Sequence, residues 1–91
     1  MARISLDEFR TNRVEDLMNQ FFFYENKVRE LAGNGERFTT VLEWQKQAAD
    51  IIHDVDDEGL LHLAKDMYPW EKDTIKSYLE IYDEIQSGVK L

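Results

Sequence analysis

Residues 14–35 read VEDLMNQFFFYENKVRELAGNG, and this stretch decides the fold class. Its apolar side chains recur at three- and four-residue steps, at Val14, Leu17, Met18, Phe21, Tyr24, Val28 and Leu31. At about 100° per residue these positions share one face, which predicts an amphipathic α-helix. Gly33, Asn34 and Gly35 follow. They tolerate the positive φ of a helix C-cap and therefore predict that the helix ends near residue 32.

Two helix starts precede this stretch. Residues 5–8, Ser-Leu-Asp-Glu, fit a capping box, in which the Ser hydroxyl and the Glu carboxylate satisfy free backbone donors. Asn12, with Glu15 three residues later, offers a second start. The sequence therefore allows either a short extra helix over about 5–11 before a helix over about 12–32, or one continuous helix over 5–32.

Three further helices are expected after the loop. A capping box at Thr40–Glu43 predicts a helix over about 40–55. Asp56 or Asp57 is expected to cap a third helix over about 57–67, and Pro69 suits the first turn of a fourth over about 69–87, with Gly88 as its stop. No segment alternates with a strand period. We therefore expect an all-α bundle of four main helices in a single domain, residues 1–91.

Composition narrows the function classes. The chain of 91 residues has a formal net charge of −8 and no cysteine, which excludes disulfides, thiol catalysis and cysteine-ligated zinc. No apolar run approaches the ~20 residues of a membrane span, and the N-terminus lacks an apolar signal core. A cytoplasmic protein without membrane contact is the expectation. The acidity also argues against direct nucleic-acid binding, because phosphate backbones would be repelled.

The negative charge is concentrated in residues 54–68. This segment has five acids, Asp54, Asp56, Asp57, Glu58 and Asp66, against one lysine, which gives −4 of the total −8. Such a local field favours a basic protein partner, or a nucleic-acid-binding protein that mistakes it for DNA. His62 is expected on the polar side of its helix, beside Asp66.

Part of the acidic segment matches a calcium-binding loop. Asp54, Asp56 and Glu58 occupy positions 1, 3 and 5 of such a loop, with Gly59 at position 6. Lys65 stands at position 12, where a calcium loop needs a bidentate Glu. The competing interpretation is that the acids cap a helix. We therefore expect no metal or other cofactor, with Asp54, Asp56 and Glu58 as weak candidate ligands.

A second acidic pattern suggests an enzyme. Asp54-x-x-Asp57 with Glu80-x-x-Asp83 resembles the paired acids of all-α nucleotide pyrophosphohydrolases of the MazG type. That resemblance implies magnesium-dependent nucleotide hydrolysis by these four acids. Helical periodicity, however, directs Glu80 and Asp83 away from the apolar face of their helix. Neither histidine has metal-binding spacing, and no catalytic residue is expected.

Phe23 violates the helical pattern, because it falls nearly opposite the apolar face of its helix. In one interpretation the N-terminal segment folds back and covers it with Ile4, Leu6 or Phe9. In the other, Phe23 contacts a partner or a second copy of the chain.

The N-terminal arginines lead to a related question. Arg3, Arg10 and Arg13 share one side if residues 3–13 are helical. They then pair with acids of the same chain, or with the acidic face of a second copy.

The function expected from the sequence is protein–protein interaction by a non-enzymatic helical protein, a regulator or adaptor of bacterial or phage type. The partner is expected to be basic, and a homodimer is left open. The expected interaction surface comprises Phe23, Asp54, Asp56, Asp57, Glu58, His62 and Asp66. The alternatives are a DNA mimic that inhibits a nucleic-acid-binding protein, and the magnesium-dependent hydrolase.

Overall fold

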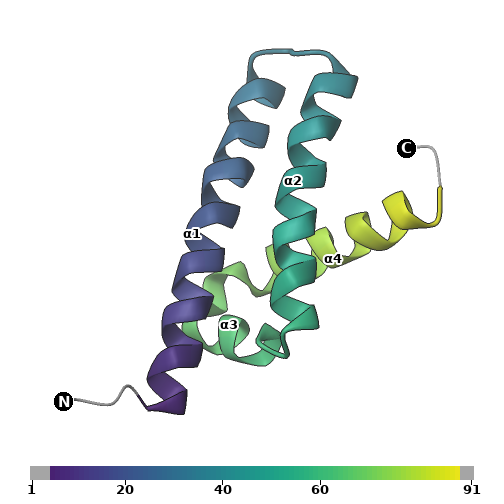
Figure 1. The fold of residues 1–91 in the computed structure, drawn as a ribbon. Helices are drawn as coiled ribbons and strands as arrows, with labels where there is room; N and C mark the ends of the chain where they lie inside the picture. Colours follow the sequence, from purple (N-terminus) through teal and green to yellow (C-terminus); the bar gives the residue numbers. More distant parts are fainter. Residues whose placement is uncertain (1–4, 89–91) are drawn as a thin grey trace.

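A computed structural model describes residues 5–88 of the chain. In chain order its elements are α1 (Leu6–Gly33), α2 (Phe38–Asp57), α3 (Leu61–Met67), the 3-10 turn η1 (Pro69–Glu71) and α4 (Lys72–Gln86). α1 and α2 form a long antiparallel hairpin, and α3 and α4 lie against its lower part (Figure 1). The predicted all-α bundle of four main helices is thus confirmed, and the described residues contain no strand. Within the same span, no helix is long and apolar enough to cross a membrane.

The core lies where α3 and α4 meet the hairpin. Fully buried side chains come from all four helices, and the largest are Val14, Met18, Phe21, Ile52, Val55 and Ile75 of α1, α2 and α4. Phe21 packs edge-on against Tyr78 of α4, with ring centroids 5.1 Å apart. These are the positions that helical periodicity directs inward, so the apolar faces of α1, α2 and α4 close on one another.

The far half of the hairpin has only two layers. α1 has 28 residues, which at 1.5 Å per residue is about 42 Å, and the molecule measures 51 Å along its longest axis. α3 and α4 do not reach the end at which α1 turns into α2 (Figure 1). Side chains there therefore pack only between α1 and α2.

α1 is one continuous helix, which settles the choice that the sequence left between one helix and two. Ser5 caps it, and the Ser5 hydroxyl accepts a hydrogen bond of 3.1 Å from the backbone N–H of Glu8. Of the two interpretations of Phe23, the one in which Leu6 or Phe9 folds back over it is wrong. Leu6 and Phe9 continue along the same helix axis and stay 64% and 63% exposed, while Phe23 is 60% exposed. Ile4 and Arg3 lie outside the described residues.

The junction between α2 and α3 differs from its prediction. α2 starts at Phe38 rather than Thr40 and ends at Asp57 rather than residue 55. Asp56 and Asp57 therefore do not cap a third helix; they lie in the last turn of α2, and α3 begins at Leu61 without a side-chain cap.

Glycine fixes the position of this junction. Gly59 adopts φ +72°, and the backbone N–H of Leu60 donates to the carbonyl of Val55 at 2.9 Å. This is a Schellman stop, which places the end of α2 at the glycine rather than at the acids. Gly88 has φ +76° just after α4, as predicted for the stop of that helix.

α4 leaves the bundle at an angle and rests mainly on α2 (Figure 1). Pro69 begins the turn η1, and α4 itself starts three residues later, at Lys72. The imidazole of His53 on α2 stacks on the ring of Tyr82, with centroids 4.0 Å apart and planes 5° from parallel. This stack fixes which side of α2 is occupied by α4.

Candidate interaction surface

The residues predicted to form one interaction surface fall into three groups, on α1, at the end of α2 and, for His62 and Asp66, on α3. Phe23 lies halfway along α1 and contacts Trp44 of α2, with ring centroids 6.4 Å apart. The acids Asp54, Asp56, Asp57 and Glu58 occupy the end of α2, ten to fourteen residues after Trp44. At 1.5 Å per residue this separation is about 15–21 Å along the helix axis. The predicted residues therefore do not form a single compact patch.

The acidic end of α2 is exposed and strongly negative. Asp54, Asp56, Asp57 and Glu58 are all solvent-accessible and surround the buried Val55. A helix C-terminus carries the negative end of the helix dipole, so these carboxylates add to that field instead of balancing it. Sequence reasoning had assigned the acids to a helix start, where the dipole has the opposite sign. The arrangement lowers the stability of α2 and strengthens attraction for cations.

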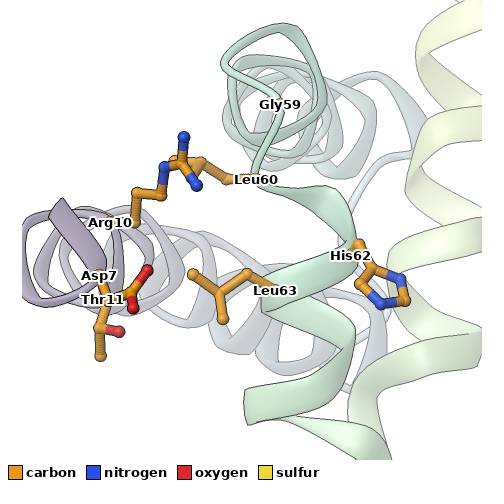
Figure 2. A pocket seen from close by; sticks show the side chains of 7 residues that line it. All are labelled: Asp7, Arg10, Thr11, Gly59, Leu60, His62 and Leu63. Atoms are coloured by element: carbon orange, nitrogen blue, oxygen red, sulfur yellow. The ribbon is translucent and has the colours of Figure 1, made fainter.

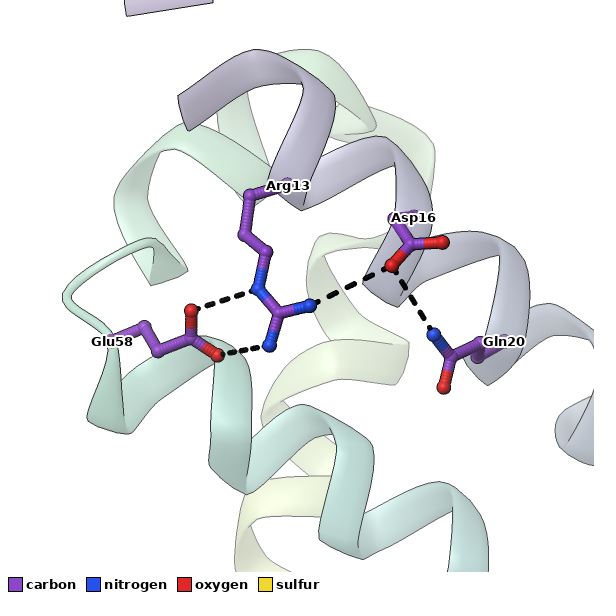
Figure 3. Close-up of polar contacts among 4 residues, drawn as sticks. All are labelled: Arg13, Asp16, Gln20 and Glu58. Atoms are coloured by element: carbon purple, nitrogen blue, oxygen red, sulfur yellow. Dashed lines mark hydrogen bonds and ion pairs between the residues drawn. The ribbon is translucent and has the colours of Figure 1, made fainter. Parts of the chain in front are cut away.

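Arg13 of α1 offsets part of this charge. Its Nε and Nη2 donate to the two carboxylate oxygens of Glu58, each at 2.9 Å, and its Nη1 lies 3.6 Å from Asp16 (Figure 3). The Arg13 hydrogen bond lowers the pKa of Glu58, and in return Glu58 raises the pKa of Arg13. Intrachain pairing, one of the two alternatives for the N-terminal arginines, is therefore what the structure shows at Arg13. Arg10 instead lines the hollow described below.

The candidate metal ligands are not gathered. At 100° per residue, Asp56 lies about 160° around α2 from Asp54, so the two carboxylates face opposite sides of the helix. Glu58, the third candidate, is held by Arg13. Within residues 5–88 no group of three or more acidic or histidine side chains is placed to hold a metal ion. Glu80 and Asp83 of the enzyme-like pattern are exposed on α4.

His62 lines a hollow at the base of the bundle. The His62 imidazole lies 3.5 Å from the Asp66 carboxylate, one helical turn away, and both side chains are largely exposed. The hollow, about 280 Å³, lies between the first turns of α1 and α3 (Figure 2). Its lining residues are Asp7, Arg10, Thr11, Gly59, Leu60, His62 and Leu63. Cationic, anionic and apolar groups are mixed there, so it favours no single ligand charge.

A further acidic feature was missed by the sequence analysis. Glu43, Asp50, Asp54, Asp57 and Glu58 are exposed, and at 100° per residue they fall within an arc about 100° wide on α2. We call this set the acidic stripe. It runs alongside α1, because Glu58 pairs with Arg13 at one end and Glu43 shares a hollow with Tyr24 at the other. Periodicity of the polar residues would have revealed it, as periodicity of the apolar residues revealed the core.

The stripe begins beside a group of three aromatic side chains. Phe23, Tyr24 and Trp44, here called the aromatic cluster, contact one another with centroid distances of 5.3, 5.8 and 6.4 Å. Tyr24 and Trp44 are half-buried and Phe23 is exposed. Because Glu43 immediately precedes Trp44, the stripe connects the aromatic cluster to the acidic end of α2. Phe23 and the carboxylates of Asp54, Asp57 and Glu58 thus lie toward opposite ends of one elongated surface. Asp56 faces the other side of α2, and His62 and Asp66 lie on α3.

A scan against protein-family models and searches of curated proteins and of solved structures found no match to this chain. A functional assignment therefore has to come from the surface itself.

Proposed function

We propose that the protein is a non-enzymatic helical adaptor or regulator that binds a basic segment of another protein along the acidic stripe. The observation that carries this proposal is the row of five exposed carboxylates, Glu43 to Glu58, which starts beside the aromatic cluster. The stripe supplies long-range attraction and alignment, and the exposed aromatic ring supplies apolar contact area.

Charge spacing supports an additive field. Glu43 and Glu58 are fifteen residues apart, which is about 22 Å along a helix axis. Apart from one longer gap after Glu43, neighbouring acids of the stripe lie within about 6 Å of one another along the axis. This is less than the Debye length of about 8 Å at physiological salt, so their potentials reinforce one another. A basic segment is thereby attracted most strongly along Asp50 to Glu58, while Glu43 lies about 10 Å further along the axis, beyond the exposed Lys46.

The aromatic cluster adds what charge alone does not provide. Exposed carboxylates contribute mainly to the rate of encounter and to selectivity, whereas buried aromatic anchors contribute most of the binding free energy. Phe23 contacts Tyr24 and Trp44 yet remains 60% solvent-accessible, so it offers apolar surface to a partner. Contact with a partner would bury this surface.

The same row of acids also supports the DNA-mimic alternative. The charge density of the stripe, however, is well below that of duplex DNA. Duplex DNA carries one negative charge per about 1.7 Å of its axis, or about 13 charges over 22 Å. The stripe has five carboxylates over that length, and Arg13 pairs with one of them. The charge density of the stripe therefore suits a basic protein segment better than it suits a binding site built for DNA. The hydrolase alternative has less support, since its acids are not gathered.

The test compares two charge-neutralised variants. One is Asp50→Asn, Asp54→Asn and Asp57→Asn on the stripe; the matched control is Glu80→Gln, Asp83→Asn and Glu84→Gln on α4. Each removes the same charge from exposed positions. Affinity capture from extract of the native host should recover a partner with wild type and control, lose it with the stripe variant, and release it as salt rises.

Three results of this experiment would redirect the assignment. Equal capture by the two variants would refute the stripe as the binding surface. Displacement of the captured partner by duplex DNA would favour the DNA mimic. Light scattering of the free protein tests for a homodimer. If the wild type and the control are dimers and the stripe variant is a monomer, the partner is a second copy of the chain.

A further inference from the structure

Two adjoining hollows flank Trp44 on the two-layered half of the hairpin. Their volumes are about 300 and about 400 Å³. The first is lined by Thr39, Thr40, Glu43 and Trp44, and the second by Tyr24, Glu43, Trp44 and Gln47. Glu43 and Trp44 line both, so one carboxylate and one indole are shared by two shallow, open hollows.

The lining has the chemistry of a cation site. It contains two aromatic rings, one carboxylate, and the hydroxyl and amide oxygens of the two threonines and Gln47, but no basic side chain. Ring faces attract cations, Trp most strongly, and a carboxylate binds a guanidinium with two parallel hydrogen bonds. A planar guanidinium uses both features at once, whereas an ammonium is a strongly hydrated point charge. Arginine is therefore the side chain that this lining fits best.

The indole is held in place before any ligand arrives. Trp44 contacts Tyr24 and Phe23 of α1, with ring centroids 5.8 and 6.4 Å away. A ring already fixed by neighbours loses little conformational entropy on binding. Glu43 takes part in none of the ion pairs among residues 5–88. Its carboxylate is thus available to a ligand, although Lys46, one turn later, is a cation on the same helix.

We infer that the Trp44–Glu43 hollow binds an arginine side chain of the basic segment that occupies the acidic stripe. The guanidinium lies over the indole of Trp44 and donates hydrogen bonds to the Glu43 carboxylate, with the hydroxyl and amide oxygens as further acceptors. This inference rests on the proposed function, because Glu43 is the first acid of the stripe. It adds the chemical identity of the anchoring side chain.

Intrinsic fluorescence provides a direct test, because the chain has two tryptophans. Trp70 is 72% exposed on η1, so Trp70→Phe leaves Trp44 as the single reporter at little structural cost. The probes are three capped helical peptides with identical alanine backgrounds. They carry arginine, lysine or the neutral arginine analogue citrulline at three- and four-residue steps.

The arginine peptide is expected to change the emission of Trp44 and to bind several-fold more tightly than the lysine peptide. The citrulline peptide is expected not to bind. Glu43→Gln should lower the affinity for the arginine peptide about tenfold, which is the expected cost of losing one charge-assisted hydrogen-bonded pair. Glu80→Gln on α4 removes the same charge away from the hollow and should leave the affinity unchanged. Trp44→Leu removes the reporter, so its affinities for the three peptides are measured by isothermal titration calorimetry beside those of the wild-type protein. This variant, checked for folding by circular dichroism, should abolish the preference for arginine over lysine.

Failure of this inference can be distinguished from failure of the proposed function. If arginine and lysine peptides bind equally, or Glu43→Gln has no effect, while the Asp50, Asp54 and Asp57 triple variant abolishes binding, the arginine site is refuted and the stripe stands. If neither basic peptide binds the wild-type protein at low salt, both proposals are refuted.

Discussion

Arg13 and Glu58 are separated by 45 positions in the sequence, yet the guanidinium of one donates two hydrogen bonds of 2.9 Å to the carboxylate of the other. The pair joins the second turn of α1 to the cap of α2 at the open end of the hairpin. Both side chains are more than one-third exposed, so water screens the interaction. Its role is to fix the register of the two long helices rather than to supply much stability.

Removing one partner of this pair should have a small, pH-dependent effect. Glu58→Gln is expected to lower the free energy of unfolding by about 0.5 kcal/mol at neutral pH, as for an exposed bidentate pair. The pKa of Glu58 is lowered from its ordinary 4.5 by the Arg13 hydrogen bond. The pair's contribution is therefore fully present above pH 4.5 and is lost as pH falls through the folded pKa. Urea unfolding of both proteins across this range should show their curves converging in acid.

Tyr78 should give the protein an alkaline limit. Burial, with a further contribution from the Glu25 carboxylate and opposition from Arg29, raises the pKa of Tyr78 to about 12. The folded state therefore favours the neutral phenol, and this contribution is complete below the ordinary pKa of 10.0 and lost as pH rises toward 12. Two pKa units correspond to about 2–3 kcal/mol.

The variant Tyr78→Phe keeps the ring that packs on Phe21 and removes the ionising group. Its unfolding free energy should decline less between pH 10 and 12 than that of wild type. When its tyrosines are titrated by tyrosinate absorbance, the step at the highest pH should be missing. Tyr82→Phe serves as the control, and equal alkaline slopes for all three proteins would contradict the assignment.

Two phenylalanines two positions apart on α1 should behave very differently. Phe21 has no exposed surface and Phe23 is 60% exposed. Phe21→Ala should lower the free energy of unfolding by about 3–5 kcal/mol, because it leaves a cavity in the core. Phe23→Ala should cost less than about 1 kcal/mol, as is usual for an exposed position. Chemical denaturation measures both, and a Phe23 cost equal to that of Phe21 would show that Phe23 is covered in solution.

Two glycines provide a matched pair for the junction after α2. A Cβ added at Gly59 or at Gly33 would meet no atom within 4 Å, so neither substitution causes a clash. Gly59 has φ +72°, and Gly59→Ala should cost about 1–2 kcal/mol through backbone strain. Gly33 ends α1 without positive φ, and Gly33→Ala should stabilise by about 0.5–1 kcal/mol. Thermal unfolding should thus move in opposite directions for the two variants.

The sequence predicted the helices well because apolar periodicity and glycine stops are local signals. The predicted helical face from Val14 to Leu31 lies within α1, and Gly88 follows α4 as expected. The boundary between α2 and α3 was wrong because acids are compatible with either a helix start or a solvent-facing last turn. Only the Schellman bonds around Gly59 decide between these, and they depend on backbone conformation.

The interaction surface stays a prediction, although the positions of its residues could be compared with the structure. Phe23 was recognised as a pattern violation, and its exposure on the described structure agrees with a role outside the core. Its contact with Trp44 was not predicted, because a sequence does not show which helices lie side by side. For the same reason the sequence does not show which acids pair with the arginines. The structure shows that Arg13 pairs with Glu58.

The two-layered end of the hairpin has a consequence for cooperativity. With no third helix behind it, this end is expected to open locally, and its amides to exchange with solvent sooner than those near Ile52. Trp44 is one of the few large side chains that hold it closed, and it also lines the inferred arginine site. A ligand there would therefore slow amide exchange across the hairpin end, so occupancy would be recorded in the protection pattern of residues that never touch the ligand.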